Sequence, residues 1–132
     1  MESDDDEETM MTNKVVVKRA DSWNFVQFHL NLQVSKSQQH FLAPYRQTCD
    51  HYLVEVGEPG ATLVRRLLGL EGVETVSIER YMVSVTRGVA FDEAFVGKLA
   101  LDVIVKSLQI EVVEGPKWAT DKPADVAGAM PN

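Results

Sequence analysis

The segment FVQFHLNLQV, residues 25–34, alternates apolar and polar side chains more regularly than any other part of the chain. The apolar positions on one side are Val26, Phe28, Leu30, Leu32 and Val34. The positions between them are Phe25, Gln27, His29, Asn31 and Gln33. A repeat of two residues is the period of a β-strand, and a single apolar side is typical of an antiparallel sheet that is covered on one face. We therefore expect a strand over residues 25–34 with a largely polar outer side.

Two segments downstream have helical spacing instead. In residues 61–68 the apolar positions recur at intervals of one, three and four, at Leu63, Val64, Leu67 and Leu68. Gly69 follows and is expected to end this helix in the left-handed conformation. A second helix is expected from the N-cap Asp92 to about Leu108, with Phe91 and Val96 placed for a hydrophobic staple.

The remaining apolar runs are short and predict strands. We expect them at residues 14–19, 52–56, 73–79, 81–87 and 109–114, with residues 73–87 forming a hairpin. Residues 35–50 have no period and are expected to form an irregular loop. Strands and helices in this order predict an α+β fold, an antiparallel sheet with two helices packed on one face.

The chain has 132 residues, the size of one domain that can bury a core without disulfides or metals. Residues 1–13 are expected to be a disordered acidic tail, residues 14–115 the α+β domain, and residues 116–132 a loose C-terminal tail. Trp118 is the exception in the last segment, since a large aromatic side chain is expected to fold back onto the domain. Met10 and Met11 lie where an internal start would give a tailless form.

The net charge of −7 comes mostly from six acids in the first 13 residues, and the rest has 14 acids and 13 bases. A nearly neutral domain has no overall field for nucleic acid phosphates, so we expect no nucleic acid partner. No apolar run approaches the roughly 20 residues that cross a bilayer, so no membrane association is expected. The chain has one cysteine, which cannot form an internal disulfide. The expected location is cytoplasmic.

His40, Cys49 and His51 are the residues from which a reactive site would have to be built. A closed zinc site needs four ligands, and Asp50 alone is left to complete the set. Cys49 and His51, two residues apart, would share one face of an extended segment and suggest a nucleophile with its base. We interpret them as ordinary polar loop residues, and we expect no enzyme activity, no metal and no cofactor.

Four residues are candidates for a partner surface: His29, Arg65, Arg66 and Arg80. Arg65 and Arg66 point away from the apolar stripe of their helix, and Arg80 lies at the turn of the hairpin. If the end of the helix and the hairpin at residues 73–87 lie close together, these three arginines and Arg87 would form a basic patch. Otherwise they would be part of a charged solvent face. His29 lies on the polar side of the first long strand.

Residues 61–87, ATLVRRLLGLEGVETVSIERYMVSVTR, resemble the N-terminal domain of the Nfu/NifU-type iron–sulfur cluster scaffold proteins. That family has a leucine-rich short helix, a Gly-Val turn and a hairpin that ends in Val-Thr-Lys. The matching residues here are Leu63, Arg65, Leu67, Leu70, Gly72, Val73, Val76, Val83, Val85, Thr86 and Arg87. Glu71 departs from the proline that the family favours at its position.

The family's cluster is held by a Cys-x-x-Cys pair in a separate domain, and this chain has no such pair. The resemblance therefore implies a stand-alone module with a protein partner and without cluster ligands of its own. The expected function is a non-enzymatic scaffold or protein-interaction module, accessory to iron–sulfur cluster assembly. The alternative is a ferredoxin-like, ACT-type regulatory domain that binds a small ligand near residues 70–73 or self-associates.

Overall fold

The computed structural model describes residues 13–19 and 24–120. The expected acidic tail and most of the C-terminal segment lie outside this part. The elements follow the chain in the order β1 Lys14–Arg19, β2 Phe25–Leu30, β3 Gln39–Leu42, α2 Cys49–Val56, α3 Gly60–Leu68, β4 Val73–Glu79, β5 Met82–Arg87, α4 Glu93–Leu108, β6 Glu111–Glu114 and α5 Lys117–Thr120.

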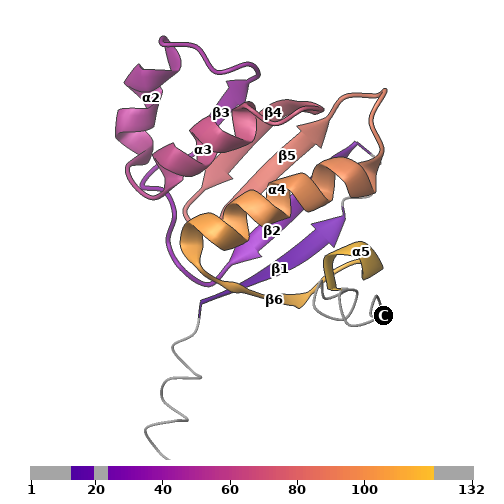
Figure 1. Cartoon of the computed structure of the whole chain (residues 1–132). Helices are drawn as coiled ribbons and strands as arrows, with labels where there is room; N and C mark the ends of the chain where they lie inside the picture. The colour runs from indigo at the N-terminus through magenta and orange to yellow at the C-terminus, as the bar shows by residue number, and fades with distance from the viewer. Residues whose placement is uncertain (1–12, 20–23, 121–132) are drawn as a thin grey trace, which may run out of the picture.

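The six strands form one sheet in the order β3-β4-β5-β2-β1-β6. The pairs β1–β2, β2–β5, β3–β4 and β4–β5 are antiparallel, as expected of the sheet, whereas β6, in the segment where the last strand was expected, runs parallel to β1. Helices α3 and α4 lie side by side over one face of the sheet (Figure 1). The predicted α+β fold with two helices on one face is confirmed, with α2 and α5 added at its margins.

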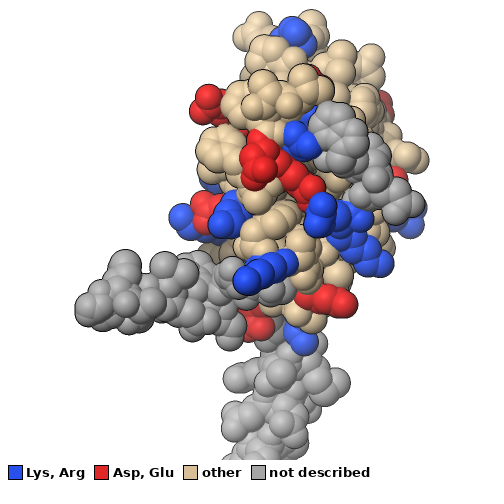
Figure 2. Space-filling view, turned by 90° about the vertical axis from the view of Figure 1, so that its right-hand side faces the viewer, with Lys and Arg blue, Asp and Glu red and all other residues tan. Residues whose placement is uncertain are grey.

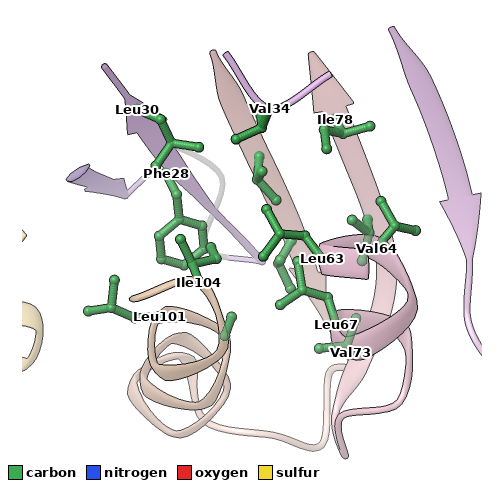
Figure 3. Close-up of a cluster of buried hydrophobic side chains, with 14 of the residues drawn as sticks. Phe28, Leu30, Val34, Leu63, Val64, Leu67, Val73, Ile78, Leu101 and Ile104 are labelled. Atoms are coloured by element: carbon green, nitrogen blue, oxygen red, sulfur yellow. The ribbon is translucent and has the colours of Figure 1, made fainter. Parts of the chain in front are cut away.

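The core lies between this helical layer and the sheet, as Figure 3 shows. Phe28 of β2 and Ile78 of β4 are fully buried, as are Leu63 and Leu67 of α3 and Ile104 of α4. These are the positions that period two on the strands and helical spacing on α3 and α4 assign to one side. Burial of so many aliphatic side chains is the main stabilising contribution to the fold.

Helix α4 begins as predicted. The Asp92 carboxylate accepts hydrogen bonds from the backbone N–H groups of Ala94 at 3.0 Å and Phe95 at 3.2 Å, which is an N-cap. Its row Val96, Ala100 and Ile104 is buried against the sheet. The Phe91 ring stacks on that of Phe95, 6.2 Å between centroids.

Two expected segments have a different structure. Residues 52–56 are not a strand but the second part of helix α2. Leu53 and Val56, three residues apart, are buried, whereas Val54 is 78% exposed. Helical spacing against α3 therefore outweighs the β-propensity of two valines. Residues 39–42, expected to be loop, form β3 because Phe41 is buried opposite Val76 of β4.

The ends of β2 and α3 also differ from expectation. Strand β2 stops at Leu30 instead of Val34, because the Val34 N–H leaves the β1–β2 ladder and donates to the Arg80 carbonyl at 2.7 Å. The expected left-handed conformation at Gly69 is wrong, since Gly69 has a φ of −88°. Gly72 has the positive φ, 91°, and makes the turn into β4. Beyond residue 116, α5 packs on α4 and places the Trp118 ring against Gly97, as expected for Trp118.

Candidate protein-binding face

The sheet face that points away from α3 and α4 carries half-exposed side chains; we call it the open face. Alternation along the strands places there Lys14, Val16 and Lys18 of β1, Phe25, Gln27 and His29 of β2, Met82, Ser84 and Thr86 of β5, Thr75, Ser77 and Glu79 of β4, and His40 and Leu42 of β3. Their neighbours along each strand are mostly buried core residues. The open face is therefore the reverse of the surface that makes the core.

Strand register aligns these side chains in rows across the sheet. One row runs Val16, His29, Met82 and Glu79, and the next runs Lys18, Gln27, Ser84, Ser77 and His40. Such cross-strand neighbours have Cβ atoms roughly 5 Å apart, close enough to act on a ligand together. In the second row the His40 Nδ1 lies 2.6 Å from the Ser77 Oγ, a hydrogen bond across β3 and β4.

At one end of the open face lies a hollow of about 700 Å³, which we call the His29–Arg80 hollow. It is lined by Gln27, His29, Lys36, Ser37, Gln38, Glu79, Arg80, Tyr81 and Met82. Two backbone hydrogen bonds form its rim, Leu30 N–H to the Tyr81 carbonyl at 2.8 Å and Val34 N–H to the Arg80 carbonyl at 2.7 Å. They hold the chain after β2 against the β4–β5 turn.

His29 is a half-buried titratable group of this hollow. Its Nε2 lies 3.2 Å from the Gln27 Oε1. Burial lowers the pKa of His29 below its usual value of 6.5, the positive charge of Lys18 lowers it further, and Glu79 opposes both. The imidazole is thus poised to stay neutral at physiological pH and to offer both a donor and an acceptor.

The structure brings two of the four predicted surface residues together, His29 and Arg80. Arg65 and Arg66 lie elsewhere, on α3 in the helical layer. Arg65 pairs with Asp50 at 3.7 Å, and Arg66 donates to the Ser107 Oγ of α4 at 2.7 Å. Arg65 and Arg66 therefore do not join Arg80 at the hollow, which fits the charged solvent face better than the basic patch.

Arg65 belongs to a small polar cluster on the α2–α3 side. The Tyr45 hydroxyl donates to the Asp50 carboxylate, and this hydrogen bond is the main reason that the pKa of Tyr45 is raised above its usual 10.0. The hydrogen bond between Tyr45 and Arg65 is in turn the main cause of a raised Arg65 pKa. This cluster ties the chain before α2 to α3 and uses the Arg65 charge internally.

His40, Cys49 and His51 are not gathered into a site. Within residues 13–19 and 24–120 no group of three or more His, Cys, Asp and Glu side chains is placed to hold a metal ion. Cys49 and His51 lie on helix α2 rather than on an extended segment, so residues two apart point to different sides. Cys49 is half-buried, and the exposed His51 ring packs edge-on against Tyr52 at 5.2 Å.

A second hollow, of about 680 Å³, opens beside the turn before β4. It is lined by Leu42, Ala43, Pro44, Arg46, Leu68, Gly69, Leu70, Val73, Glu74 and Thr75. This is the region where the ACT-type alternative places an effector. Its walls are more apolar than those of the His29–Arg80 hollow.

Charges of both signs alternate over the surface that Figure 2 shows. The ion pairs of the domain include Arg19 with Glu93 at 2.6 Å and Lys106 with Asp102 at 3.3 Å. None of the helices in the part that the structure describes is both long and apolar enough to traverse a bilayer.

Comparisons with known proteins give a fold neighbour and no family. No protein-family model and no curated protein matches the chain. The X-ray crystal structure of protein SAV1430 from Staphylococcus aureus, a structural genomics target, superposes with a TM-score of 0.50 at 14% identity. The match covers 69% of this chain and 98% of that protein. The similarity supports the α+β fold and says nothing of activity.

Sequence reasoning found part of the candidate site and missed the rest. The alternation of residues 25–34 identified the polar side that holds Gln27 and His29, and the hairpin identified the turn at Arg80. Lys36 and Gln38 were missed because they lie in a segment without periodicity. Backbone contacts of Leu30 and Val34 with the turn, and the Gln38 amide near the Glu79 carboxylate at 3.5 Å, bring that segment to the hollow.

Proposed function

We propose that this chain is a non-enzymatic scaffold or protein-interaction module that binds a partner protein through its open face. The observation that carries the proposal is the composition of that face around the His29–Arg80 hollow. Tyr81, which is 50% exposed, and Met82 lie beside Arg80. Tyr, Met and Arg are the residues enriched at protein interfaces, where a few of them supply most of the binding energy.

The partner class follows from the sequence of residues 61–87. Because this segment resembles the N-terminal domain of the Nfu/NifU-type scaffolds, we propose an accessory role in iron–sulfur cluster assembly, with a cytoplasmic assembly factor or client as partner. The chain itself would hold no cluster, since it lacks the Cys-x-x-Cys pair. No metal, nucleic acid or membrane enters this proposal.

The proposal is tested by site-specific photo-crosslinking in cells. A photoreactive amino acid at Ser84, on the open face, is compared with one at Asp102, exposed on α4. Crosslinks from position 84 to an iron–sulfur assembly factor or client, absent from position 102, support the proposal. Equal labelling from both positions, or partners unrelated to cluster assembly, contradict it.

A matched pair of variants then measures the affinity for the captured partner. Tyr81→Ala truncates an exposed aromatic side chain at the rim of the hollow, and Tyr52→Ala truncates one of equal exposure, 50%, on α2. If the open face is the interface, Tyr81→Ala weakens binding about 10-fold or more and Tyr52→Ala leaves it unchanged. The reverse pattern would move the interface to the helical layer.

The second hollow favours one other function, an ACT-type regulatory domain. Its lining by Leu70 and Val73 places an apolar concavity of ligand size where that alternative needs it. A thermal-shift screen with amino acids and nucleotides tests it, because a ligand at 100 times its Kd stabilises the folded state by about 2.7 kcal/mol. Arg46→Ala, at this hollow, should abolish such a shift, and Arg66→Ala should keep it.

A further inference from the structure

The His29–Arg80 hollow carries more positive than negative charge. Lys36 and Arg80 are both exposed and line it together with the half-buried His29, and Glu79 is the acid of the lining. The ion pairs among the residues that the structure describes engage neither Lys36 nor Arg80. Two cations against one carboxylate in the lining of one concavity leave a net positive charge, which attracts a carboxylate-rich segment.

The surroundings of the hollow extend this positive character along β1. Lys14 lies on the open face at the start of the strand, with Glu111 of β6 beside it, and Lys18 lies further along. Lys18 also faces His29 closely enough to lower the His29 pKa. The lysines of β1 thus lie on this side of the sheet, and Glu111 and Glu114 of β6 pair with the Lys14 and Val16 positions of that strand.

The same chain contains a segment of opposite charge next to this site. Residues 2–8 contain Glu2, Asp4, Asp5, Asp6, Glu7 and Glu8, and no Lys or Arg occurs before Lys14. No basic residue in the segment can neutralise these carboxylates. A positively charged site on the domain or on another molecule can therefore attract this segment.

The topology places the His29–Arg80 hollow within reach of the acidic segment, residues 2–8. Strand β1 starts at the same end of the sheet as the β4–β5 turn (Figure 1). The Lys14 carbonyl accepts from the Asn31 N–H at 3.2 Å, and the neighbouring Leu30 N–H donates to the Tyr81 carbonyl at 2.8 Å. Two strand spacings, roughly 10 Å, therefore separate Lys14 from the turn. The six residues from Glu8 to Lys14 span up to about 20 Å when extended, so the acids can reach the hollow.

We propose that the acidic segment, residues 2–8, docks in the His29–Arg80 hollow and competes there with the partner. The contacts are exposed ion pairs, which are individually weak and screened by salt. Covalent attachment compensates, because a short linker gives an effective concentration on the order of millimolar. The docking concerns this chain alone, and only its competition with a partner rests on the function proposed above.

Paramagnetic broadening in the full-length chain tests the docking directly. In a Cys49→Ser background, Met10→Cys carries a nitroxide label, and the amide resonances of the domain are recorded. Docking predicts strong broadening at Lys36, Arg80 and Met82 in low salt, and its loss at about 1 M NaCl, where the Debye length falls to about 3 Å. Broadening confined to the residues next to Lys14 would overturn the proposal.

Neutralisation of charge provides the matched comparison. Changing Glu2, Asp4, Asp5, Asp6, Glu7 and Glu8 to the corresponding amides should remove the broadening, as should Lys36→Gln with Arg80→Gln. The control changes Glu71 and Glu74, exposed acids at the other end of β4, to Gln and should leave it intact. Broadening that survives the neutralisation of residues 2–8 would contradict an electrostatic dock.

Competition between the acidic segment and the partner is measured separately, as the affinity of each variant for the partner captured by crosslinking. Neutralising residues 2–8 should tighten partner binding several-fold, and the Glu71 and Glu74 control should not change it. If the broadening is lost in the neutralised variants and kept in the control, while the affinity for the partner stays constant, the acidic segment docks in the hollow but does not compete with the partner. Absence of any partner would refute the proposed function and leave the paramagnetic result standing.

Discussion

Gly60 lies so close to Val34 that a Cβ at Gly60 would be 2.2 Å from the Val34 carbonyl oxygen. The same Cβ would meet the Val56 Cγ1 at 2.6 Å and the Ile78 Cδ1 at 2.9 Å. The first residue of α3 is therefore seated directly on the chain that leaves β2. This contact fixes where the helical layer begins relative to the sheet.

Gly60→Ala should destabilise the protein by about 3 kcal/mol, because a backbone carbonyl cannot move aside as a side chain can. Urea unfolding followed by circular dichroism measures the change. The control is Gly69→Ala, with φ −88° and the nearest contact at 3.5 Å, which should change stability by less than about 0.5 kcal/mol. Equal effects of the two substitutions would mean that α3 is not seated as described.

Gly97→Ala should displace the Trp118 ring. A Cβ at Gly97 would be 2.4 Å from the Trp118 Cη2, so the indole must leave its place against α4. In a Trp23→Phe background, where Trp118 is the sole tryptophan, we expect a red-shifted emission maximum as the ring becomes more exposed. Gly88→Ala, whose Cβ would find its nearest neighbour at 3.5 Å, is the control and should leave the emission unchanged.

Asp92→Ala should lower the free energy of unfolding by about 1 kcal/mol, because the N–H groups of Ala94 and Phe95 lose their acceptor. Asp92→Asn keeps a side-chain oxygen and should cost only a few tenths of a kcal/mol. Thermal unfolding of the two variants measures the difference. Similar losses in both would assign the effect to charge at the helix start rather than to capping.

The pKa of His29 should respond in opposite directions to its two charged neighbours. Lys18→Gln removes a charge that lowers this pKa and should raise it, whereas Glu79→Gln should lower it further. Titration of the imidazole resonances by NMR measures both, with Lys106→Gln, in the α4 ion pair, as the control. Shifts of the same sign in both variants would contradict the arrangement of the open face.

The lowered pKa of His29 also gives a pH dependence of stability. Between the folded-state pKa and 6.5 the unfolded chain binds more protons at this group, so its contribution to stability falls as pH drops through that range. Above 6.5 the imidazole is neutral in both states and contributes no slope. Relative to the wild type, His29→Gln should therefore gain stability on acidification below pH 6.5. Chemical unfolding measured from pH 5 to 7.5 checks the sign.

Local periodicity in the sequence determined most of the core. The alternation after Phe25 predicted the buried side of β2, and helical spacing predicted Leu63 and Leu67 of α3. Asp92 predicted the start of α4. Each of these signals is written in neighbouring residues, because a strand or helix with one buried side repeats its pattern over several turns or pleats.

Tertiary structure alone decided strand β3, helix α2 and the parallel pairing of β6, which depend on distant residues. The four residues of β3 become a strand only through Val76 and its neighbours in β4, and β6 adds in parallel to β1 from almost a hundred residues away. Helix α2 forms where its valines suggested a strand, since Leu53 and Val56 are buried as a helical pair. Local propensity is weak compared with such burial.

The candidate site shows the same division. The sequence alone determined the chemistry of two of its residues, a histidine on a polar strand side and an arginine at a turn. Their meeting required the folded chain, because hydrogen bonds from Leu30 and Val34 to the β4–β5 turn bring Lys36 beside Arg80 and His29. Segments some fifty residues apart share no local pattern, so only the packing of the sheet could place them around one hollow.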